Sequence, residues 1–304
     1  MTLSPIVAPE VARALLDGRG VVALESTLIT HGLPWPDNVA VARAAEAAVC
    51  ESGSVPATIA LLGGVIRVGL LDSELDTLAR SSHVRKASRR DLAFCLAERH
   101  DAATTVSATL WVAQSVGIGV MATGGLGGVH RGAATTSDIS NDLDALARAD
   151  GIAVICSGVK SILDIPATLD ALETRGVLVV GYATATFPAF TSTTSGLPVE
   201  HRIDTPAAAA RLIQAHRGLP LPGAIVFAHP VAEAVAVPPD VMDAAIDQAL
   251  QAAATAGITG KAVTPFLLDQ VRQATGGQSL IANRALIIAN AHLAGQIATR
   301  LTDR

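Results

Sequence analysis

The sequence predicts an α/β protein, and two observations support this fold class. Short apolar runs alternate with longer helical segments from Val21–Leu24 to Ala224–Ala228, which is typical of buried strands separated by helices. Half of the 304 residues are hydrophobic but only 3% are aromatic, so we expect a core of Ala, Val, Leu and Ile. This length allows either one large α/β domain or two smaller ones.

The chain begins with a predicted helix and a predicted strand. Pro9–Leu16 carries proline in its first turn, and Gly18 follows its end, which is typical of a helix. Val21–Leu24 is a buried strand that ends directly before Glu25. Such a carboxylate must be solvated at a site or paired, so Glu25 is either functional or part of an ion pair or helix cap.

The next two segments are a loop and a hairpin. ESTLITHGLPWPDN contains two prolines and a glycine, which exclude regular structure. Asp37 or Asn38 then caps a helix over Val39–Cys50. PATIALLGGVIRVGLL predicts two strands joined by a turn at Gly63-Gly64, a sheet edge that serves as scaffold.

Four cations, Arg85, Lys86, Arg89 and Arg90, precede a predicted helix. Positive charge at this end opposes the helix dipole. The cluster therefore indicates a bound anion such as a phosphate, held by cations and backbone N–H groups. A solvated charged face is the alternative interpretation.

Strands and helices alternate through the rest of the chain. We expect strands over Thr104–Val106, Ile118–Ala122, Ile152–Cys156, Val177–Tyr182 and Ala224–Ala228. We expect helices over Ala108–Ser115, Asn141–Arg148, Pro206–Ala215 and Pro239–Ala256, followed by two helices broken at Gly276-Gly277.

Flexible polar loops follow two of these strands. TGGLGG, after Ile118–Ala122, matches neither the dinucleotide-binding fingerprint nor the phosphate-binding loop. It indicates only that another group, in a ligand or in the protein, approaches the backbone closely at these glycines. Lys160 follows Ile152–Cys156. A lysine after a buried strand must reach solvent, pair or react as an amine nucleophile. Because ligands of open α/β sheets bind beyond the carboxyl ends of strands, we expect both loops to meet at one small molecule.

The segment after the glycines is rich in carboxylates and hydroxyls. Asp138, Asp142 and Asp144 have no His or Cys partner at zinc spacing, so they suit a hard cation such as Mg²⁺ or Mn²⁺ held largely by water. Capping of the next helix by Ser140 is the structural alternative. His130 alone is more typical of a hydrogen-bonded structural histidine.

Asn283 and Asn290 lie seven residues apart, on one face of the last predicted helix. Asn283 either binds a ligand or packs between helices.

Charge and composition argue against several partners. The net charge is −5, the pI is about 5.9, and no basic tract stands out, so we expect neither nucleic-acid nor membrane binding. No apolar run reaches the ~20 residues of a membrane span, and the N-terminus lacks signal-peptide features. Cys50, Cys95 and Cys156 are far apart and lie in apolar segments, which indicates reduced core residues of a cytoplasmic protein.

A series of blocks carries a resemblance to a known family. The chain resembles the pseudouridine-5′-phosphate glycosidases, the indigoidine-synthase-A-like family, in that family's order and over nearly its whole length. The blocks are ESTLITHGLPWPDN, PATIALLGG with VGL, KASRRD, TTVSATLWVA, MATGGLGGVHRG, SDISNDL, SGVKSILDIPATLDALETRGV, FPAFTSTTSG, GITGKAVTPFLL and SLIANRALIIANA.

The resemblance implies a fold and an activity. The fold is a single domain over residues 1–304, a three-layer α/β/α arrangement with a large mixed, mostly parallel central sheet, assembled as a homotrimer. The activity is reversible cleavage of the C1′–C5 bond of pseudouridine 5′-phosphate to uracil and ribose 5-phosphate, with Mn²⁺ as cofactor.

The same resemblance implies roles for individual residues. Glu25 in EST corresponds to the proton donor, Lys160 in VKSILD to the covalent nucleophile and Asp138 in SDIS to the metal ligand. His130 resembles a pocket residue and is the reserve candidate for a proton transfer. Substrate-binding positions correspond to Lys86, Val106, Ser140, Asn141, Asp142 and Asn283. The family usually has Ala in place of Asn141 and Asn-Pro in place of His229-Pro230.

Two other classes use similar features. A metal-dependent sugar kinase or phosphosugar aldolase combines an α/β sheet, glycine loops, a metal and a lysine, although the absence of a phosphate-loop motif argues against the kinase. A non-catalytic nucleotide sensor predicts tight ligand binding without turnover.

Overall fold

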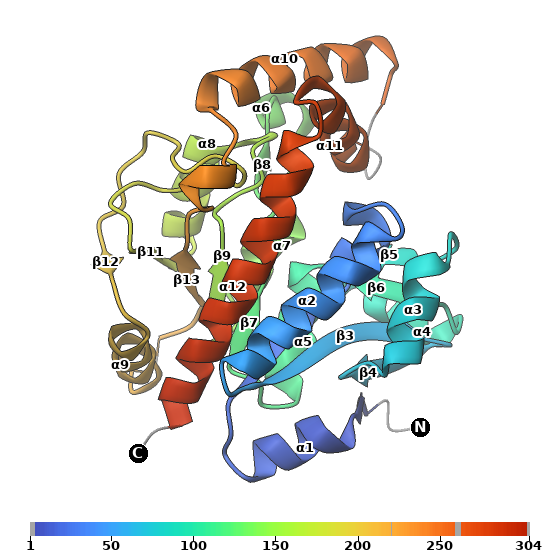
Figure 1. Ribbon diagram of the computed structural model, residues 1–304, viewed down its shortest axis with the longest axis vertical. Coiled ribbons are helices and arrows are strands. Elements are labelled where there is room, and N and C mark those ends of the chain that lie inside the picture. Colours follow the sequence, from blue (N-terminus) through green and yellow to red (C-terminus); the bar gives the residue numbers. More distant parts are fainter. Residues whose placement is uncertain (1–3, 220, 259–262, 303–304) are drawn as a thin grey trace.

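The structure, a computed structural model, describes residues 4–219, 221–258 and 263–302. An 11-stranded mixed sheet runs through it (Figure 1). The strands of its main path are, in spatial order, β1 (Ile6–Val7), β4 (Val65–Val68), β3 (Val55–Leu62), β2 (Val21–Glu25), β7 (Val120–Ala122), β9 (Ala153–Cys156), β13 (Ile225–Ala228), β11 (Leu178–Tyr182) and β12 (Arg202–Ile203). β6 (Ala102–Thr104) pairs with β3, and β5 (Arg85–Ala87) pairs with β6.

Most strand pairs in this sheet are parallel. Antiparallel pairing occurs where β3 meets β4 and β6. A separate two-stranded sheet joins β8 (Val129–His130) to β10 (Leu163–Asp164) in antiparallel register. The predicted hairpin over PATIALLGGVIRVGLL is therefore confirmed as β3 and β4.

Helices lie on both faces of the sheet. Figure 1 shows α2 (Asp37–Glu51) and α12 (Gln278–Thr302) crossing the near face, with α5 (Val106–Ser115) and α7 (Asn141–Leu146) behind the strands. The predicted three-layer α/β/α fold with a mostly parallel central sheet is confirmed. The remaining α-helices are α1 (Pro9–Leu16), α3 (Asp72–Arg80), α4 (Leu92–Ala97), α6 (Ala133–Thr136), α8 (Ile165–Thr174), α9 (Pro206–Arg217), α10 (Pro239–Thr255) and α11 (Val263–Ala274). Among these described helices none is long and apolar enough to span a membrane.

The core is built from small aliphatic side chains, as the composition predicts. The central strands are buried on both faces: every residue of β7 and β9 is buried. Such strands appear in the sequence as continuous apolar runs because helices cover both faces of a parallel sheet.

The order of the central strands creates a crevice. The chain passes from β2 to β3 on one side, whereas β7 pairs with β2 on its other side and leads on to β9. The connections therefore diverge between β2 and β7, and the crevice beyond the carboxyl ends of strands at such a switch point is where open α/β sheets bind ligands.

The segment after β2 contradicts the sequence prediction. Its prolines and glycine predict a loop without regular structure, but Leu28–Gly32 forms a short π-helix, η1. The next helix begins at Asp37, after Pro36, and neither Asp37 nor Asn38 caps it. Asn38 is instead buried, and its side-chain amide donates to the Ile29 and Ala79 carbonyls at 2.6 and 3.0 Å.

One further prediction needs correction, and some elements were not predicted. The strand expected over Thr104–Val106 ends at Thr104, because Val106 already begins α5. Arg85 and Lys86 belong to strand β5, and Arg89 lies in the 3-10 turn η2 (Arg89–Asp91) before α4. Helix α3 was not predicted.

The cysteine prediction is wrong for one of the three residues. Cys95 and Cys156 are buried, whereas Cys50 is exposed on α2. A helix that covers a sheet buries one face only, and Cys50 lies on the other.

Candidate active site

A cavity of about 430 Å³ lies at the carboxyl edge of the sheet. It contains nine of the ten residues that the sequence nominated: Glu25, Lys86, Val106, His130, Asp138, Ser140, Asn141, Asp142 and Lys160. The tenth, Asn283, lines an adjoining cavity that shares Glu25, Lys86 and Lys160 with the first. Five separate segments of the chain, at residues 25, 86, 106, 130–142 and 160, thus meet at one place.

Glu25, the last residue of β2, is held by a neighbouring strand. The Thr123 hydroxyl, directly after β7, donates a hydrogen bond to the Glu25 carboxylate. Burial raises the pKa of Glu25, while Lys160, the Thr123 hydrogen bond and Lys86 partly oppose this rise. A raised pKa increases the protonated fraction near neutral pH, as a general acid requires.

Lys160 is positioned by the backbone of two loops. Its N–H donates to the Leu126 carbonyl at 3.1 Å, and the Leu126 N–H donates to the Gly158 carbonyl at 2.9 Å. Gly158 has φ +79°, and a Cβ there would lie 2.2 Å from the Pro188 oxygen, so glycine is required at this turn. Within the described ranges, Lys160 forms no ion pair and faces the cavity with Glu25.

The glycine-rich loop packs against the protein's own side chains. A Cβ on Gly127 would lie 2.2 Å from Ser140 Oγ, and one on Gly128 would lie 2.4 Å from Thr168 Oγ1. The close approach that TGGLGG predicts is therefore real, but at these glycines it is made to the chain itself.

Asp142 connects this loop to the helix behind the sheet. Its two carboxylate oxygens accept hydrogen bonds from the Ser107 and Gly127 N–H groups at 2.9 and 3.0 Å. The Ser140 hydroxyl accepts a hydrogen bond from the Asp142 N–H at 3.2 Å. Ser140 therefore caps α7, which is the structural role that the sequence suggested as an alternative.

One end of the cavity is cationic. Lys86 and Arg90 line it together with Ser88. Of the other cations in the cluster, Arg85 lies over the Phe94 ring, 5.4 Å from its centroid, and neither it nor Arg89 lines the cavity. Two of the four cations are thus placed to contact an anion there.

His130 and Asp138 form a pair at the rim. His130 Nδ1 lies 3.9 Å from Asp138 Oδ2, and the His130 N–H donates to the Asp138 carbonyl at 3.0 Å. Burial lowers the pKa of His130, with Lys160 and Lys86 acting in the same direction and Asp138 opposing. We therefore expect a neutral imidazole at neutral pH.

The donors near Asp138 allow one kind of metal site. In the described part of the chain no three His, Cys, Asp or Glu residues cluster to hold a metal. Asp138 has a 43% exposed side chain, whereas both oxygens of Asp142 already accept backbone N–H groups. This set fits a hard cation bound through one carboxylate, with water and ligand oxygens as its other partners.

Sequence reasoning missed several residues at the site. Thr123, which hydrogen-bonds Glu25, was not singled out, although it stands directly between β7 and the glycines. Arg175 and Thr27 line the cavity, and Arg175 is paired with Asp144 at 2.8 Å. No sequence signal identified them, because their contacts depend on which strands and helices become neighbours.

The fold and this cavity define an α/β protein with a candidate active site at the switch point of its sheet, in which a lysine and a carboxylate meet. Residues 10–300 match the family described as "Indigoidine synthase A like protein". The chain belongs to this family.

Curated relatives and solved structures agree with this assignment. The chain is 52% identical over 295 residues to a protein from Solibacter usitatus named pseudouridine-5′-phosphate glycosidase, covering 97% of this chain and 98% of that protein. It is 51% identical over 300 residues to a Streptomyces griseus protein of the same name, covering 98% and 93%.

Among solved structures, the chain is similar to the prealnumycin C-glycosynthase AlnA in complex with ribulose 5-phosphate, with a TM-score of 0.91, 39% identity and coverage of 98% of this chain and 97% of that one. An indigoidine synthase A-like protein from Thermotoga maritima gives a TM-score of 0.87 at 36% identity, with 94% of each chain covered.

Proposed function

We propose that this enzyme reversibly cleaves the C1′–C5 bond of pseudouridine 5′-phosphate, giving uracil and ribose 5-phosphate. The observation that carries the proposal is one cavity that combines Glu25 and Lys160 with the cationic end formed by Lys86 and Arg90. The curated relatives that match this chain along almost their whole length bear the name of this activity.

The bond to be broken dictates the chemistry. The base is joined to the sugar by a carbon–carbon bond, so the usual glycosidase route of protonating a leaving-group oxygen or nitrogen does not apply. The reaction needs a group that accepts the electrons of the bond as it breaks. An amine attached to C1′ meets this need, because its lone pair forms a C=N bond while the base leaves.

The first step opens the ribose ring. Glu25 delivers a proton to O4′ as the C1′–O4′ bond breaks, and the Lys160 amine bonds to C1′. The new secondary ammonium then returns a proton to the Glu25 carboxylate. The raised pKa of Glu25 supports this acid role.

The second step expels the base. The nitrogen lone pair forms a protonated imine with C1′ as the C1′–C5 bond breaks, and the bonding electrons stay on uracil C5. Protonation at C5 by Glu25, with His130 as the reserve donor, completes uracil. Water then hydrolyses the imine, which releases ribose 5-phosphate and the free amine of Lys160.

The remaining residues bind the substrate. Lys86 and Arg90 are the partners that we assign to the 5′-phosphate, because paired cations recognise phosphate oxygens. Val106, Ser140, Asn141 and Asp142 line the same cavity as these cations, and we assign them to the sugar-phosphate.

Asp138 is the residue that we assign to a Mn²⁺ ion. The ion would supply positive charge to substrate oxygens. The homotrimer implied by the resemblance remains a prediction, tested by whether the mass in solution is three times the 30.9 kDa of one chain. The cytoplasmic location is likewise a prediction.

Incubation with pseudouridine 5′-phosphate and Mn²⁺ tests the function. We expect uracil and ribose 5-phosphate in equal amounts without ATP. A requirement for ATP would indicate a kinase, and tight binding with no product would indicate a sensor.

A further inference from the structure

We propose that Glu46 and Thr58, together with one water molecule, form a proton relay that connects Glu25 to solvent through the layer between α2 and the sheet. This inference rests on the proposed function and deepens it. The reaction steps above use neither Glu46 nor Thr58, and neither residue lines the two cavities that meet at Glu25 and Lys160. Glu46 therefore acts through Thr58 and not on the substrate itself.

A small cavity next to Glu25, on the α2 side of the sheet, provides the place for the water. Its volume is about 20 Å³, and Glu25, Thr58 and Thr123 line it. The wall on the α2 side is apolar and includes Ala42 and Ala45. A buried water needs a cavity of at least about 10–15 Å³ and roughly two to four polar partners. This cavity meets both conditions.

The Thr58 hydroxyl joins the small cavity to Glu46. Thr58 lies in β3 and is 2% exposed, and its Oγ1 donates to Glu46 Oε1 at 2.5 Å. A hydroxyl that donates to one group can still accept from another, so Thr58 can bond Glu46 and the water at once. A carboxylate and a hydroxyl in an otherwise apolar layer cost desolvation free energy, and a function for the pair explains their presence there.

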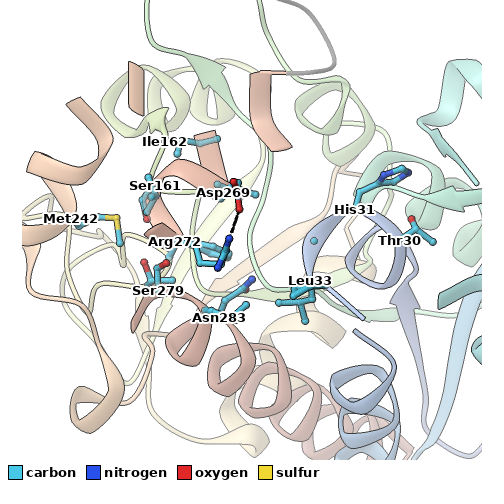
Figure 2. A pocket seen from close by; sticks show the side chains of 17 residues that line it. Thr30, His31, Leu33, Ser161, Ile162, Met242, Asp269, Arg272, Ser279 and Asn283 are labelled. Carbon is cyan, nitrogen blue, oxygen red and sulfur yellow. Dashed lines mark hydrogen bonds and ion pairs between the residues drawn. The ribbon is translucent and has the colours of Figure 1, made fainter. Parts of the chain in front are cut away.

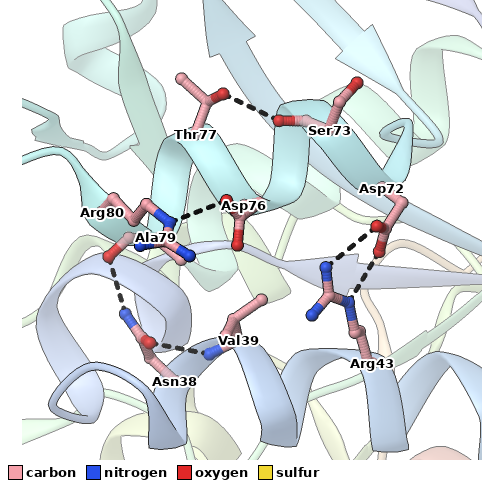
Figure 3. Close-up of polar contacts among 9 residues, drawn as sticks. All are labelled: Asn38, Val39, Arg43, Asp72, Ser73, Asp76, Thr77, Ala79 and Arg80. Carbon is pink, nitrogen blue, oxygen red and sulfur yellow. Dashed lines mark hydrogen bonds and ion pairs between the residues drawn. The ribbon is translucent and has the colours of Figure 1, made fainter.

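Glu46 leads from this layer to the protein surface. It is partly exposed, and Arg43, one turn earlier on α2, binds Asp72 of α3 at the surface through hydrogen bonds of 2.6 and 2.9 Å (Figure 3). Burial raises the pKa of Glu46, and Asp72 acts in the same direction while the Thr58 hydrogen bond and Arg43 oppose it. Burial also raises the pKa of Glu25. Both carboxyl groups therefore exchange protons closer to neutral pH than an ordinary glutamate does.

The substrate side of Glu25 is the side that a ligand fills. Glu25 lines both the cavity of about 430 Å³ and the smaller one beside it, which the substrate occupies in the proposed reaction. A further cavity of about 380 Å³ shares His31 and Asn283 with the smaller one but is not lined by Glu25 (Figure 2). A bound substrate thus separates Glu25 from solvent on this side, whereas the small cavity on the α2 side leaves a second route.

The relay moves one proton without changing the groups between its ends. A protonated Glu25 gives its proton to the water, the water gives one of its own to Thr58 Oγ1, and the Thr58 hydroxyl gives its original proton to the Glu46 carboxylate. Glu46 then releases a proton to solvent. The water and Thr58 each gain one proton and lose one. The hydrogen bond from Thr58 to Glu46 already points in the direction that this release requires.

Hydrogen exchange at uracil C5 tests the relay. In the synthetic direction, Glu25 takes the C5 hydrogen of uracil as the C1′–C5 bond forms. If Glu25 exchanges this hydrogen with D₂O before the bond breaks again, free uracil gains deuterium at C5. Mass spectrometry measures the initial rate of this exchange, which is compared with the initial rate of pseudouridine 5′-phosphate synthesis in the same sample.

Glu46→Gln should lower the ratio of exchange to synthesis. Loss of a positioned carboxyl slows proton transfer by about 10²-fold or more, but deuterium on the Lys160 amine can also reach Glu25, so we expect the ratio to fall by roughly five- to tenfold. Thr58→Val removes the hydroxyl but keeps Glu46, and it should lower the ratio as much. Thr58→Ser keeps the hydroxyl and should retain the wild-type ratio.

Glu51→Gln is the control, because Glu51 is an exposed carboxylate at the end of the same helix, and it should leave the ratio unchanged. The Thr58 variants provide the test if Glu46→Gln does not fold. An unchanged ratio in folded Glu46→Gln or Thr58→Val, or no exchange in a wild-type protein that makes product, would overturn the relay. Equal losses of exchange and synthesis would also overturn it, because they indicate a purely structural pair. A wild-type protein that makes no pseudouridine 5′-phosphate would instead reject the proposed function.

Discussion

Thr123 donates its hydroxyl hydrogen bond to the Glu25 carboxylate, which joins the ends of β2 and β7 across the switch point of the sheet. This contact stabilises the ionised carboxylate and so lowers the pKa of Glu25, whereas burial acts more strongly in the opposite direction. The pKa of the proposed acid therefore depends in part on a residue that follows a neighbouring strand, in addition to burial and Lys160.

Removing this hydrogen bond should shift the pH profile. Thr123→Val leaves the burial of Glu25 but deletes a contact that favours its ionised form, so the pKa of Glu25 should rise further. Because the protonated carboxyl is the active form in ring opening, the alkaline limb of the kcat profile should move to higher pH. Thr123→Ser keeps the hydroxyl and should leave the limb in place. A shift to lower pH in the Val variant would contradict the assignment of Glu25 as the acid.

Asn290 should be important for stability. It is fully buried on α12, and its amide nitrogen donates to the Thr123 carbonyl at 2.9 Å and to Ser157 Oγ at 3.1 Å. Its oxygen lies 3.0 Å from His229 Nδ1. Asn290→Ala leaves these groups unpaired and should lower the free energy of unfolding by about 2–4 kcal/mol.

Urea denaturation followed by circular dichroism measures this change. Gln214→Ala, on the exposed face of α9, is the control and should change the free energy of unfolding by less than about 0.5 kcal/mol. Equal effects of the two substitutions would show that the Asn290 contacts contribute little.

Lys86 and Arg85 are adjacent in β5 but should differ in function. Lys86 lines the cavity, whereas Arg85 is exposed and lies over Phe94. Lys86→Ala should raise the KM for pseudouridine 5′-phosphate by about 10- to 100-fold, the value of a charge-assisted hydrogen bond. It should affect the unphosphorylated nucleoside far less. Arg85→Ala should keep the wild-type KM, and a Lys86 variant that prefers the nucleotide as strongly as wild type would remove Lys86 from the phosphate site.

Asp138 should determine metal binding. Because the described part of the chain contains no group of three or more His, Cys, Asp or Glu residues that could hold the metal, Asp138→Ala should lose Mn²⁺ affinity by at least about tenfold. Titration followed by electron paramagnetic resonance measures binding without relying on activity. Asp170→Ala, on the exposed face of α8, is the matched control, and unchanged Mn²⁺ binding in the Asp138 variant would place the metal elsewhere.

The sequence was most informative at the carboxyl ends of the buried strands. Glu25 and Lys160 come after continuous apolar runs, and strands of this kind end together at one edge of a parallel sheet. Their meeting in one cavity was therefore predictable before the structure. The general fold could be inferred from the same alternation, and its layered detail from the resemblance.

Other features depend on tertiary contacts that local patterns do not encode. The π-helix at Leu28–Gly32 forms in a segment whose prolines suggest a loop, and the Asn38 side chain, nine residues further on, donates to its Ile29 carbonyl. The contact between Thr123 and Glu25 requires β2 and β7 to be neighbours, although 98 residues separate the two side chains. The buried Nε2 of His31, which has no hydrogen-bond partner among the described residues, can be recognised only once its surroundings are known.

The central claim is that the Lys160 amine bonds to C1′. Borohydride added during turnover should reduce the imine and leave a ribose phosphate on the peptide that contains Lys160, detected by mass spectrometry. Lys160→Arg should fail as completely as Lys160→Ala, because a guanidinium stays protonated and cannot act as a nucleophile. An absence of the adduct under these conditions, together with an active Arg variant, would contradict covalent catalysis by Lys160.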